Sequence, residues 1–272
     1  QHGERRADVL AAQQQRSVDA VARPRTLELG AVCVGTDAAQ HRRGHAERAQ
    51  RTRRVGRRAA GRGGAAVEAR DRLGARRLRR AEQLHAPEFG GDQTAIHPLI
   101  LAGEAASTAH PLWNDSVLEE GQTVAFELGG CRKRYNVGLA RTVHLGTPSQ
   151  QLQETAKAVE EGMHAVMAAL RADVFAGDVH AAWQKVLDRY GLEKKSRIGY
   201  SIGAAYAPDW GEHTLSFRPD EKVPVPENAV VHIILGMWMD GWGMELSETL
   251  HVTKTGCDKL ADFPQHVHLV QR

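Results

Sequence analysis

An isolated carboxylate within an apolar strand is the most chemically informative feature of this sequence. Glu127 lies in Thr123-Val-Ala-Phe-Glu-Leu128, where most neighbouring residues are apolar. A charged side chain is costly to bury unless it is paired or serves a function. A desolvated carboxyl group is suited to exchange a proton near neutral pH or to attack as a nucleophile. The plainer alternative is a partly exposed edge-strand glutamate paired with Arg132 or Arg134.

Other motifs accompany this strand and together carry a family resemblance. They are Gly199-Tyr-Ser-Ile-Gly203, Pro208-Asp-Trp-Gly-Glu212 and Asp240-Gly-Trp-Gly-Met-Glu-Leu-Ser-Glu-Thr249. With residues 123–145 they resemble the creatinase and aminopeptidase "pita-bread" superfamily, most closely its ectoine hydrolase branch. The resemblance covers about residues 87–255 and implies an α+β fold with an antiparallel sheet flanked by helices.

The metal-ligand positions of the superfamily hold unsuitable residues in this chain. Pita-bread metallopeptidases bind two divalent ions through two Asp, one His and two Glu, since such cations need several oxygen and imidazole ligands. The matching positions fall on Glu127, Gly138, Tyr200, Ile234 and Ser247. One carboxylate cannot hold a dinuclear centre, and the nearby His232 and Glu248 do not restore the set. We therefore expect no catalytic metal and no cofactor, as in creatinase and ectoine hydrolase.

The resemblance also suggests residues that act on the substrate. His110, in Ser107-Thr-Ala-His-Pro-Leu-Trp113, matches the histidine that creatinase-like enzymes use as general acid or base, although alone it reads as a loop residue. Ectoine is a cyclic amidine with one carboxylate, so acids and aromatic rings would attract its delocalised cation. The residues expected to bind it are Tyr135, Tyr200, Asp209, Trp210 and Glu245. For Trp238 a core position is favoured.

The leading functional hypothesis is a metal-independent hydrolase that opens a C–N bond in a small cyclic amidine such as ectoine. Glu127 and His110 would be its catalytic residues, with Glu127 either general base or nucleophile. Two alternatives stay open, namely an Xaa-Pro-type metallopeptidase and a catalytically inactive truncated homologue that only binds a ligand or partner. The resemblance implies a homodimer acting on a small molecule.

The first 86 residues differ in composition from the rest of the chain. They contain 20 Arg against nine Asp plus Glu, and no Lys, Ile, Met, Asn, Phe, Tyr or Trp. Such a segment cannot build a hydrophobic core. A nucleic-acid-binding arm is an alternative for this segment, but it is not favoured because basic runs are weak motifs. We expect residues 1–86 to be a disordered low-complexity segment or the product of out-of-frame translation, and residues 87–272 to form the catalytic domain.

Several functional classes are disfavoured by composition. No run of 18 apolar residues and no amino-terminal signal pattern is present, so we expect a cytoplasmic location without a membrane partner. The three cysteines are odd in number and widely spaced, which argues against a disulfide framework or a structural zinc site.

The apolar periodicity of residues 87–272 predicts strands around two helices. Strands are expected at 94–101, interrupted by Pro98, at 123–128 and 134–145 joined through Gly129-Gly130, and at 229–238 and 244–253. The segment 147–150 should cap a helix with an apolar stripe, and Gly191 should end a second helix. The segment 196–208 reads as irregular. The stripe comprises Leu152, Ala156, Val159, Met163, Val166 and Leu170.

Overall fold

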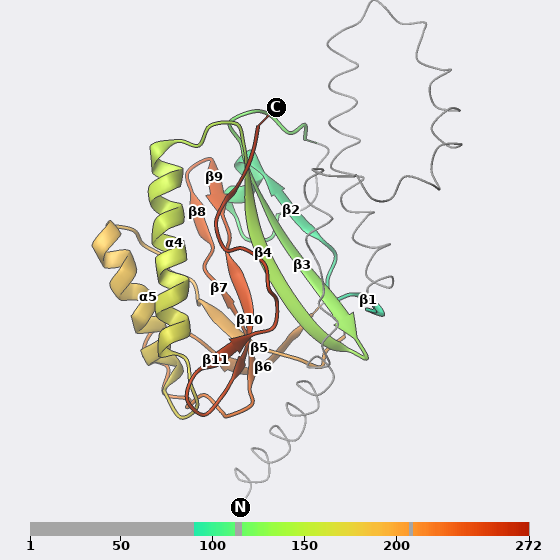
Figure 1. The fold of residues 1–272 in the computed structure, drawn as a ribbon, viewed down its shortest axis with the longest axis vertical. Helices are drawn as coiled ribbons and strands as arrows, with labels where there is room; N and C mark the ends of the chain where they lie inside the picture. Colours follow the sequence, from blue (N-terminus) through green and yellow to red (C-terminus); the bar gives the residue numbers. More distant parts are fainter. Residues whose placement is uncertain (1–89, 112–115, 207–208, 272) are drawn as a thin grey trace, which may run out of the picture.

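The computed structural model describes residues 90–111, 116–206 and 209–271, which form two β-sheets and a pair of helices (Figure 1). The Arg-rich segment and the domain boundary expected near residue 87 lie outside the described residues. None of the described helices is long and apolar enough to cross a membrane.

The first sheet is built on a long antiparallel hairpin of β3 (Thr123–Arg132) and β4 (Tyr135–Leu145). Its order is β1-β3-β4-β12, and β2 also pairs with β3. The remaining strands are β1 (Gln93–Thr94), β2 (Leu99–Ala102) and β12 (His268–Val270), and a 3₁₀ helix, η2 (Gly103–Ser107), follows β2. Pro98 separates β1 from β2, which confirms the expected interruption.

The turn of this hairpin is not where the sequence suggested. Lys133 and Arg134 make the turn with φ of 50° and 69°, whereas Gly129 and Gly130 remain in the ladder opposite Gly138 and Val137. The prediction of a Gly129-Gly130 turn was therefore wrong. Gly129 is required for a different reason, since a side chain there would overlap the ring of Trp210.

The second sheet has the order β11-β10-β7-β5-β6. Its strands are β5 (Gly199–Ile202), β6 (Gly211–Ser216), β7 (Val230–Ile234), β10 (Ser247–Val252) and β11 (Cys257–Lys259), and a separate hairpin pairs β8 (Met237–Met239) with β9 (Trp242–Met244). The strand expected over 229–238 is thus divided in two, at Leu235-Gly236. The segment 196–208, expected to be irregular, contains β5.

Two helices, α4 (Gln150–Ala169) and α5 (Ala176–Tyr190), lie side by side against the second sheet (Figure 1). The cap of α4 is Ser149, whose hydroxyl accepts a hydrogen bond from the Leu152 amide at 3.1 Å. Within the segment 147–150 expected to cap the helix, the cap is Ser149 and not Thr147, because α4 begins at Gln150 and Leu152 is its third residue. Gly191 ends α5 in the left-handed conformation, as predicted. His180, expected to face solvent, is buried.

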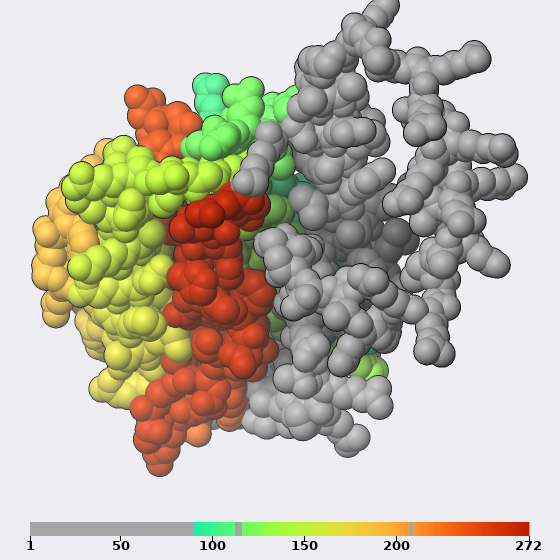
Figure 2. All heavy atoms as spheres, turned by 45° about the horizontal axis from the view of Figure 1, so that its top comes forward, coloured from blue at the N-terminus to red at the C-terminus, as the bar shows by residue number. Residues whose placement is uncertain are grey.

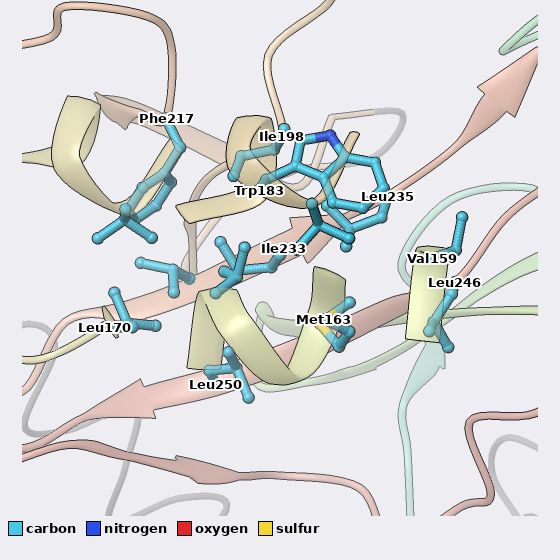
Figure 3. Packing of buried hydrophobic residues seen from close by; sticks show 14 of the residues in the cluster. Val159, Met163, Leu170, Trp183, Ile198, Phe217, Ile233, Leu235, Leu246 and Leu250 are labelled. Atoms are coloured by element: carbon cyan, nitrogen blue, oxygen red, sulfur yellow. The ribbon is translucent and has the colours of Figure 1, made fainter. Parts of the chain in front are cut away.

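The main hydrophobic core fills the space between the helices and the second sheet. Figure 3 shows Met163 of α4, Trp183 of α5 and Ile233 of β7 within this layer. All six residues of the predicted α4 stripe are buried. On the face shown in Figure 2 the carboxyl-terminal segment (red) runs beside α4 (yellow-green), where the Cys257 thiol lies 3.5 Å from the Met167 carbonyl oxygen.

Side chains join the two sheets where β4 meets β10. The Ala140 amide donates to Ser247 Oγ at 2.6 Å, and the Gly138 amide donates to Thr249 Oγ1 at 3.0 Å. Thr142 Oγ1 accepts from the Glu245 amide at 2.8 Å. The alternation of β10 thus directs small hydroxyl side chains toward the first sheet, and the candidate site lies where the sheets face each other.

Candidate active site

Glu127 is buried in the middle of β3, with 1 % of its surface exposed. It faces the same side as Thr123 and Ala125, which are also buried. The alternative of an exposed edge-strand glutamate paired with arginine is therefore wrong. Its Oε2 has no hydrogen-bond partner within the described part of the chain, so a buried acceptor is left for a ligand.

His110 reaches Glu127 from the segment after η2. Its Nε2 lies 3.6 Å from Glu127 Oε2, which is an ion-pair distance rather than a hydrogen bond. The interaction with Glu127 raises the pKa of His110, while partial burial opposes that shift. The histidine side chain is 71 % exposed, whereas the Glu127 side chain is only 2 % exposed. The structure thus brings together the two residues expected to be catalytic.

Glu245 lies close enough for its charge to interact with Glu127. Burial first, and the Glu127 charge second, raise the pKa of Glu245 to about 8. Its Oε2 also lacks a hydrogen-bond partner among the residues described. Two carboxyl groups near each other cannot both ionise cheaply, so Glu245 keeps its proton at neutral pH.

Lys194, which the sequence did not single out, contributes a buried amine to this region. Its Nζ donates to the Gly236 carbonyl at 2.8 Å and lies 3.9 Å from the centre of the Trp238 ring. Burial lowers the pKa of Lys194 to about 7, against the attraction of Glu245. The motif Glu193-Lys-Lys195 reads as a solvated charge run, so no signal in the sequence marked it. Trp238 is only partly buried, and its Nε1 lacks a partner within residues 90–111, 116–206 and 209–271.

Tyr200, Trp210 and His232 form the other part of the site. Trp210 Nε1 donates to the Tyr200 hydroxyl at 2.8 Å, and His232 Nδ1 lies 3.3 Å from the same oxygen. Burial, then the Glu127 charge, raises the pKa of Tyr200 to about 12. Burial lowers the pKa of His232 to about 4. The signal that marked Glu127, a polar residue in an apolar strand, would also have marked His232 as a site residue.

Tyr135 lies apart from this group in the structure, whereas Asp209 lies at its edge, where its charge contributes to the raised pKa of Tyr200. Tyr135 is at the start of β4 and pairs with Arg132, five residues along from Ala140, the partner of Glu127. Asp209 is exposed and accepts hydrogen bonds from the Gly211 amide at 2.9 Å and from His213 at 2.6 Å. Their contact with a substrate stays a prediction.

The residues at the superfamily's metal-ligand positions do not fit a metal pair. Ile234 and Ser247 are direct partners on β7 and β10, so two ligand positions do meet, but neither side chain is a carboxylate. A side chain at Gly138 would lie 2.8 Å from the Trp210 ring and 3.0 Å from His232. Within the described residues no cluster of three His, Cys, Asp or Glu could hold a metal ion.

Known proteins that resemble this chain include an ectoine hydrolase and several dipeptidases. The ectoine hydrolase of Halomonas elongata is 36 % identical over 180 residues, covering 66 % of this chain and 45 % of the relative. An uncharacterised hydrolase/peptidase of Sinorhizobium fredii is 34 % identical over 179 residues, covering 66 % of this chain and 46 % of the relative. The chain therefore spans about half the length of these curated relatives.

Solved structures with a similar fold include a prolidase and a dipeptidase. The prolidase of Thermococcus sibiricus superposes with a TM-score of 0.65 at 20 % identity, covering 72 % of this chain and 53 % of that one. The dipeptidase PepE of Mycobacterium ulcerans superposes with a TM-score of 0.66 at 22 % identity, covering 76 % and 57 %. The α+β pita-bread fold expected from the sequence is confirmed. The model of metallopeptidase family M24 matches residues 47–254, so the chain belongs to that family.

Proposed function

We propose that this protein is a metal-independent hydrolase that opens a C–N bond in a small cyclic amidine such as ectoine. The observation that carries the proposal is the buried Glu127, whose Oε2 has no hydrogen-bond partner among the described residues and lies beside His110. Of the five metal-ligand positions of the superfamily, only this one holds a carboxylate. The similarity to an ectoine hydrolase supports the substrate class. The relatives named as an ectoine hydrolase and an Xaa-Pro dipeptidase are both hydrolases, which supports hydrolysis as the reaction class.

Glu127 supplies the negative charge that the reaction needs. An amidinium ring is attracted to this buried carboxylate, because Coulomb attraction is strong where water is excluded. As a base, Glu127 takes a proton from water while the water oxygen bonds to the amidine carbon. As a nucleophile, its own oxygen forms that bond and water later releases the acyl group. Either route consumes one water and breaks one ring C–N bond, which yields an acetylated diaminobutyrate.

His110 is placed to protonate the leaving nitrogen. Its raised pKa favours the imidazolium form near neutral pH. When the C–N bond breaks, this proton moves to the departing nitrogen and the ring opens as an amine. Glu245, protonated at neutral pH, contributes a hydrogen-bond donor rather than a second negative charge.

A homodimer and a cytoplasmic location are part of the same proposal. The homodimer rests on the resemblance to the superfamily, in which the amino-terminal domain commonly borders the active site of the other subunit, whereas the location is the expectation drawn from the sequence composition. Sedimentation of the purified chain at several concentrations would test the dimer. A monomer at all concentrations would contradict it.

Ring opening followed by NMR tests the function directly. Purified protein is incubated with ectoine, with and without a chelator, and the product signals are recorded. We expect conversion to the acetylated diaminobutyrate at the same rate in both samples. Loss of activity with chelator, restored by a divalent metal, would instead support the metallopeptidase alternative. No turnover by folded protein would favour the inactive homologue.

A further inference from the structure

A series of hydrogen bonds runs from the backbone of β4 to the Tyr200 hydroxyl. The Ala140 amide donates to Ser247 Oγ at 2.6 Å, and Ser247 Oγ lies 2.7 Å from His232 Nε2. On the other side of the imidazole, His232 Nδ1 lies 3.3 Å from Tyr200 Oη, and Oη also accepts from Trp210 Nε1 at 2.8 Å. Distances alone do not say which imidazole nitrogen carries the proton.

A proton on Nε2 would leave a buried donor without an acceptor. Ser247 Oγ would then accept from both the Ala140 amide and His232, and its own hydroxyl hydrogen would have no other acceptor among the described side chains. Ser247 and His232 are both fully buried. An unsatisfied donor in such a place costs about 1–3 kcal/mol.

A proton on Nδ1 leaves only the Tyr200 O–H without an acceptor, on a side chain that is partly exposed and not fully buried like Ser247. The Ser247 hydroxyl then donates to His232 Nε2, and Nδ1–H donates to the Tyr200 oxygen. Tyr200 accepts two N–H donors, from His232 and Trp210, which fills the acceptor capacity of its hydroxyl oxygen. Its own O–H is left to donate to something else.

We propose that His232 and Ser247 are positioning residues that hold the Nδ1–H tautomer and so commit the Tyr200 hydroxyl to donating its hydrogen bond to a substrate oxygen beside Glu127. This inference rests on the proposed function for the identity of the substrate, but the tautomer can be measured without any substrate. Ala140, whose amide begins the series, is the cross-strand partner of Glu127, so the series starts beside the catalytic carboxylate. The Glu127 charge also contributes to the raised pKa of Tyr200.

The same arrangement explains how two former metal-ligand positions are used. Tyr200 and Ser247 occupy two of the five positions, and His232 lies between them. His232 and Trp210 also fill the space that a side chain at Gly138 would need. Edge-to-face packing of the His232 ring, with its centre 5.1 Å from that of Trp210, holds it there. Hydrogen bonds thus orient groups that a metal orients in the peptidases.

The tautomer is measured by long-range ¹H–¹⁵N correlation NMR on the full chain labelled with ¹⁵N-histidine. The His232 signals are assigned as those that disappear in His232→Gln. We expect a pyrrole-like Nδ1 and a pyridine-like Nε2 near pH 7. A pyridine-like Nδ1 would overturn the proposal, because Nδ1 would then accept the hydrogen bond of the Tyr200 O–H, which would no longer be available to a substrate.

Variants on β10 separate positioning from general packing. Ser247→Ala removes the donor to Nε2, so the His232 nitrogens should move toward averaged shifts of two tautomers. Thr249→Val is the matched control, since its lost hydroxyl binds Gly138 rather than His232, and it should leave the tautomer unchanged. An unchanged tautomer in Ser247→Ala would remove Ser247 from the proposal. If that variant does not fold, the wild-type spectrum still decides.

The kinetic consequence is tested with ectoine. Tyr200→Phe should lower kcat/KM by about 100- to 1,000-fold, as for loss of one oriented donor, and Ser247→Ala should lower it less. Tyr200→Phe with wild-type kcat/KM would contradict the role of the hydroxyl. If wild type does not turn over ectoine, the NMR result still stands by itself, so failure of the substrate assignment is distinguishable from failure of this inference.

Discussion

At the scale of single residues, the site is governed by how few charges it can hold. Glu127 and Glu245 are both buried and interact, while His110 lies at the exposed side. Because desolvation and mutual repulsion both oppose a second negative charge, one carboxyl group stays protonated. This division allows one acid to act on the substrate while the other donates a hydrogen bond.

Replacing Glu127 by Gln should abolish turnover and leave the fold intact. The amide keeps the shape of the side chain but can neither take a proton nor attack the amidine carbon. Turnover of ectoine and the circular dichroism spectrum check the two parts. Glu119→Gln, at an exposed carboxylate, is the control and should retain full activity. A Glu127→Gln variant as active as wild type would refute the catalytic assignment.

Glu245→Gln should make the slope of stability against pH more positive, because it removes a falling contribution and leaves the opposite one from His232, whose pKa is lowered to about 4. The folded pKa of Glu245 is about 8, above its ordinary value of 4.5, so between these values the native state keeps a proton that the unfolded state has lost. Its contribution to the free energy of unfolding therefore falls as pH rises through this window. Urea unfolding between about pH 5 and 7 measures the slope below the Lys194 transition.

The control for this measurement is Glu193→Gln, because the Glu193 side chain is 73 % exposed. It should reproduce the wild-type slope. An identical slope for Glu245→Gln and wild type would show that Glu245 is already ionised in the folded protein.

At the scale of elements, close packing decides which glycines are needed. Gly162 of α4 lies directly against the Trp183 ring of α5, and a side chain there would overlap that ring. Trp183 is fully buried in the main core, so it has little room to move. The approach of the two helices thus depends on the missing side chain.

Gly162→Ala should destabilise the protein despite the better helix propensity of alanine. The propensity gain is about 1 kcal/mol, whereas overpacking against a buried ring costs about 1–3 kcal/mol. Thermal unfolding followed by circular dichroism should show a lower Tm. Ala168→Gly, at an exposed position of the same helix, isolates the propensity term. A raised Tm for Gly162→Ala would mean that α5 shifts without cost.

At the scale of the whole molecule, Arg141 connects three parts of the chain. From β4 its guanidinium binds Glu248 of β10 at 2.6 Å, the Ser247 carbonyl at 2.6 Å, and the carbonyls of Phe263 and Pro264 at 3.0 and 2.6 Å. Arg141 thus braces β4 against β10. Its contacts join both sheets to the carboxyl-terminal segment.

Arg141→Met should lower the free energy of unfolding by about 3–5 kcal/mol, because Glu248 would be left buried without its partner. Chemical denaturation measures this change. Arg189→Met is the control, since its ion pair with Glu161 is largely exposed and such pairs contribute little. A loss no larger than that of Arg189→Met would show that Gln265, which also binds Glu248 at 2.8 Å, compensates.

The features that depend on local pattern could be predicted from the amino-acid sequence alone. Strand alternation puts Glu127 on the same face as Thr123 and Ala125, helical spacing identified the α4 stripe, and Gly191 marked the end of α5. These features follow from periods of two and 3.6 residues. The motifs also indicated the family and the loss of metal ligands.

The features that depend on contacts between residues distant in the sequence could be established only from the folded structure. Trp210 packs against Gly129 of β3, and Lys194 of the charged run 193–195 lies over Trp238. The raised pKa of Glu245 reflects its burial first and the charge of Glu127 second. No local pattern encodes these relations, since each side chain comes from a different element. Burial and electrostatic interaction depend on where the whole chain places a group, which is why the chemistry of the site emerges only when the two sheets face each other.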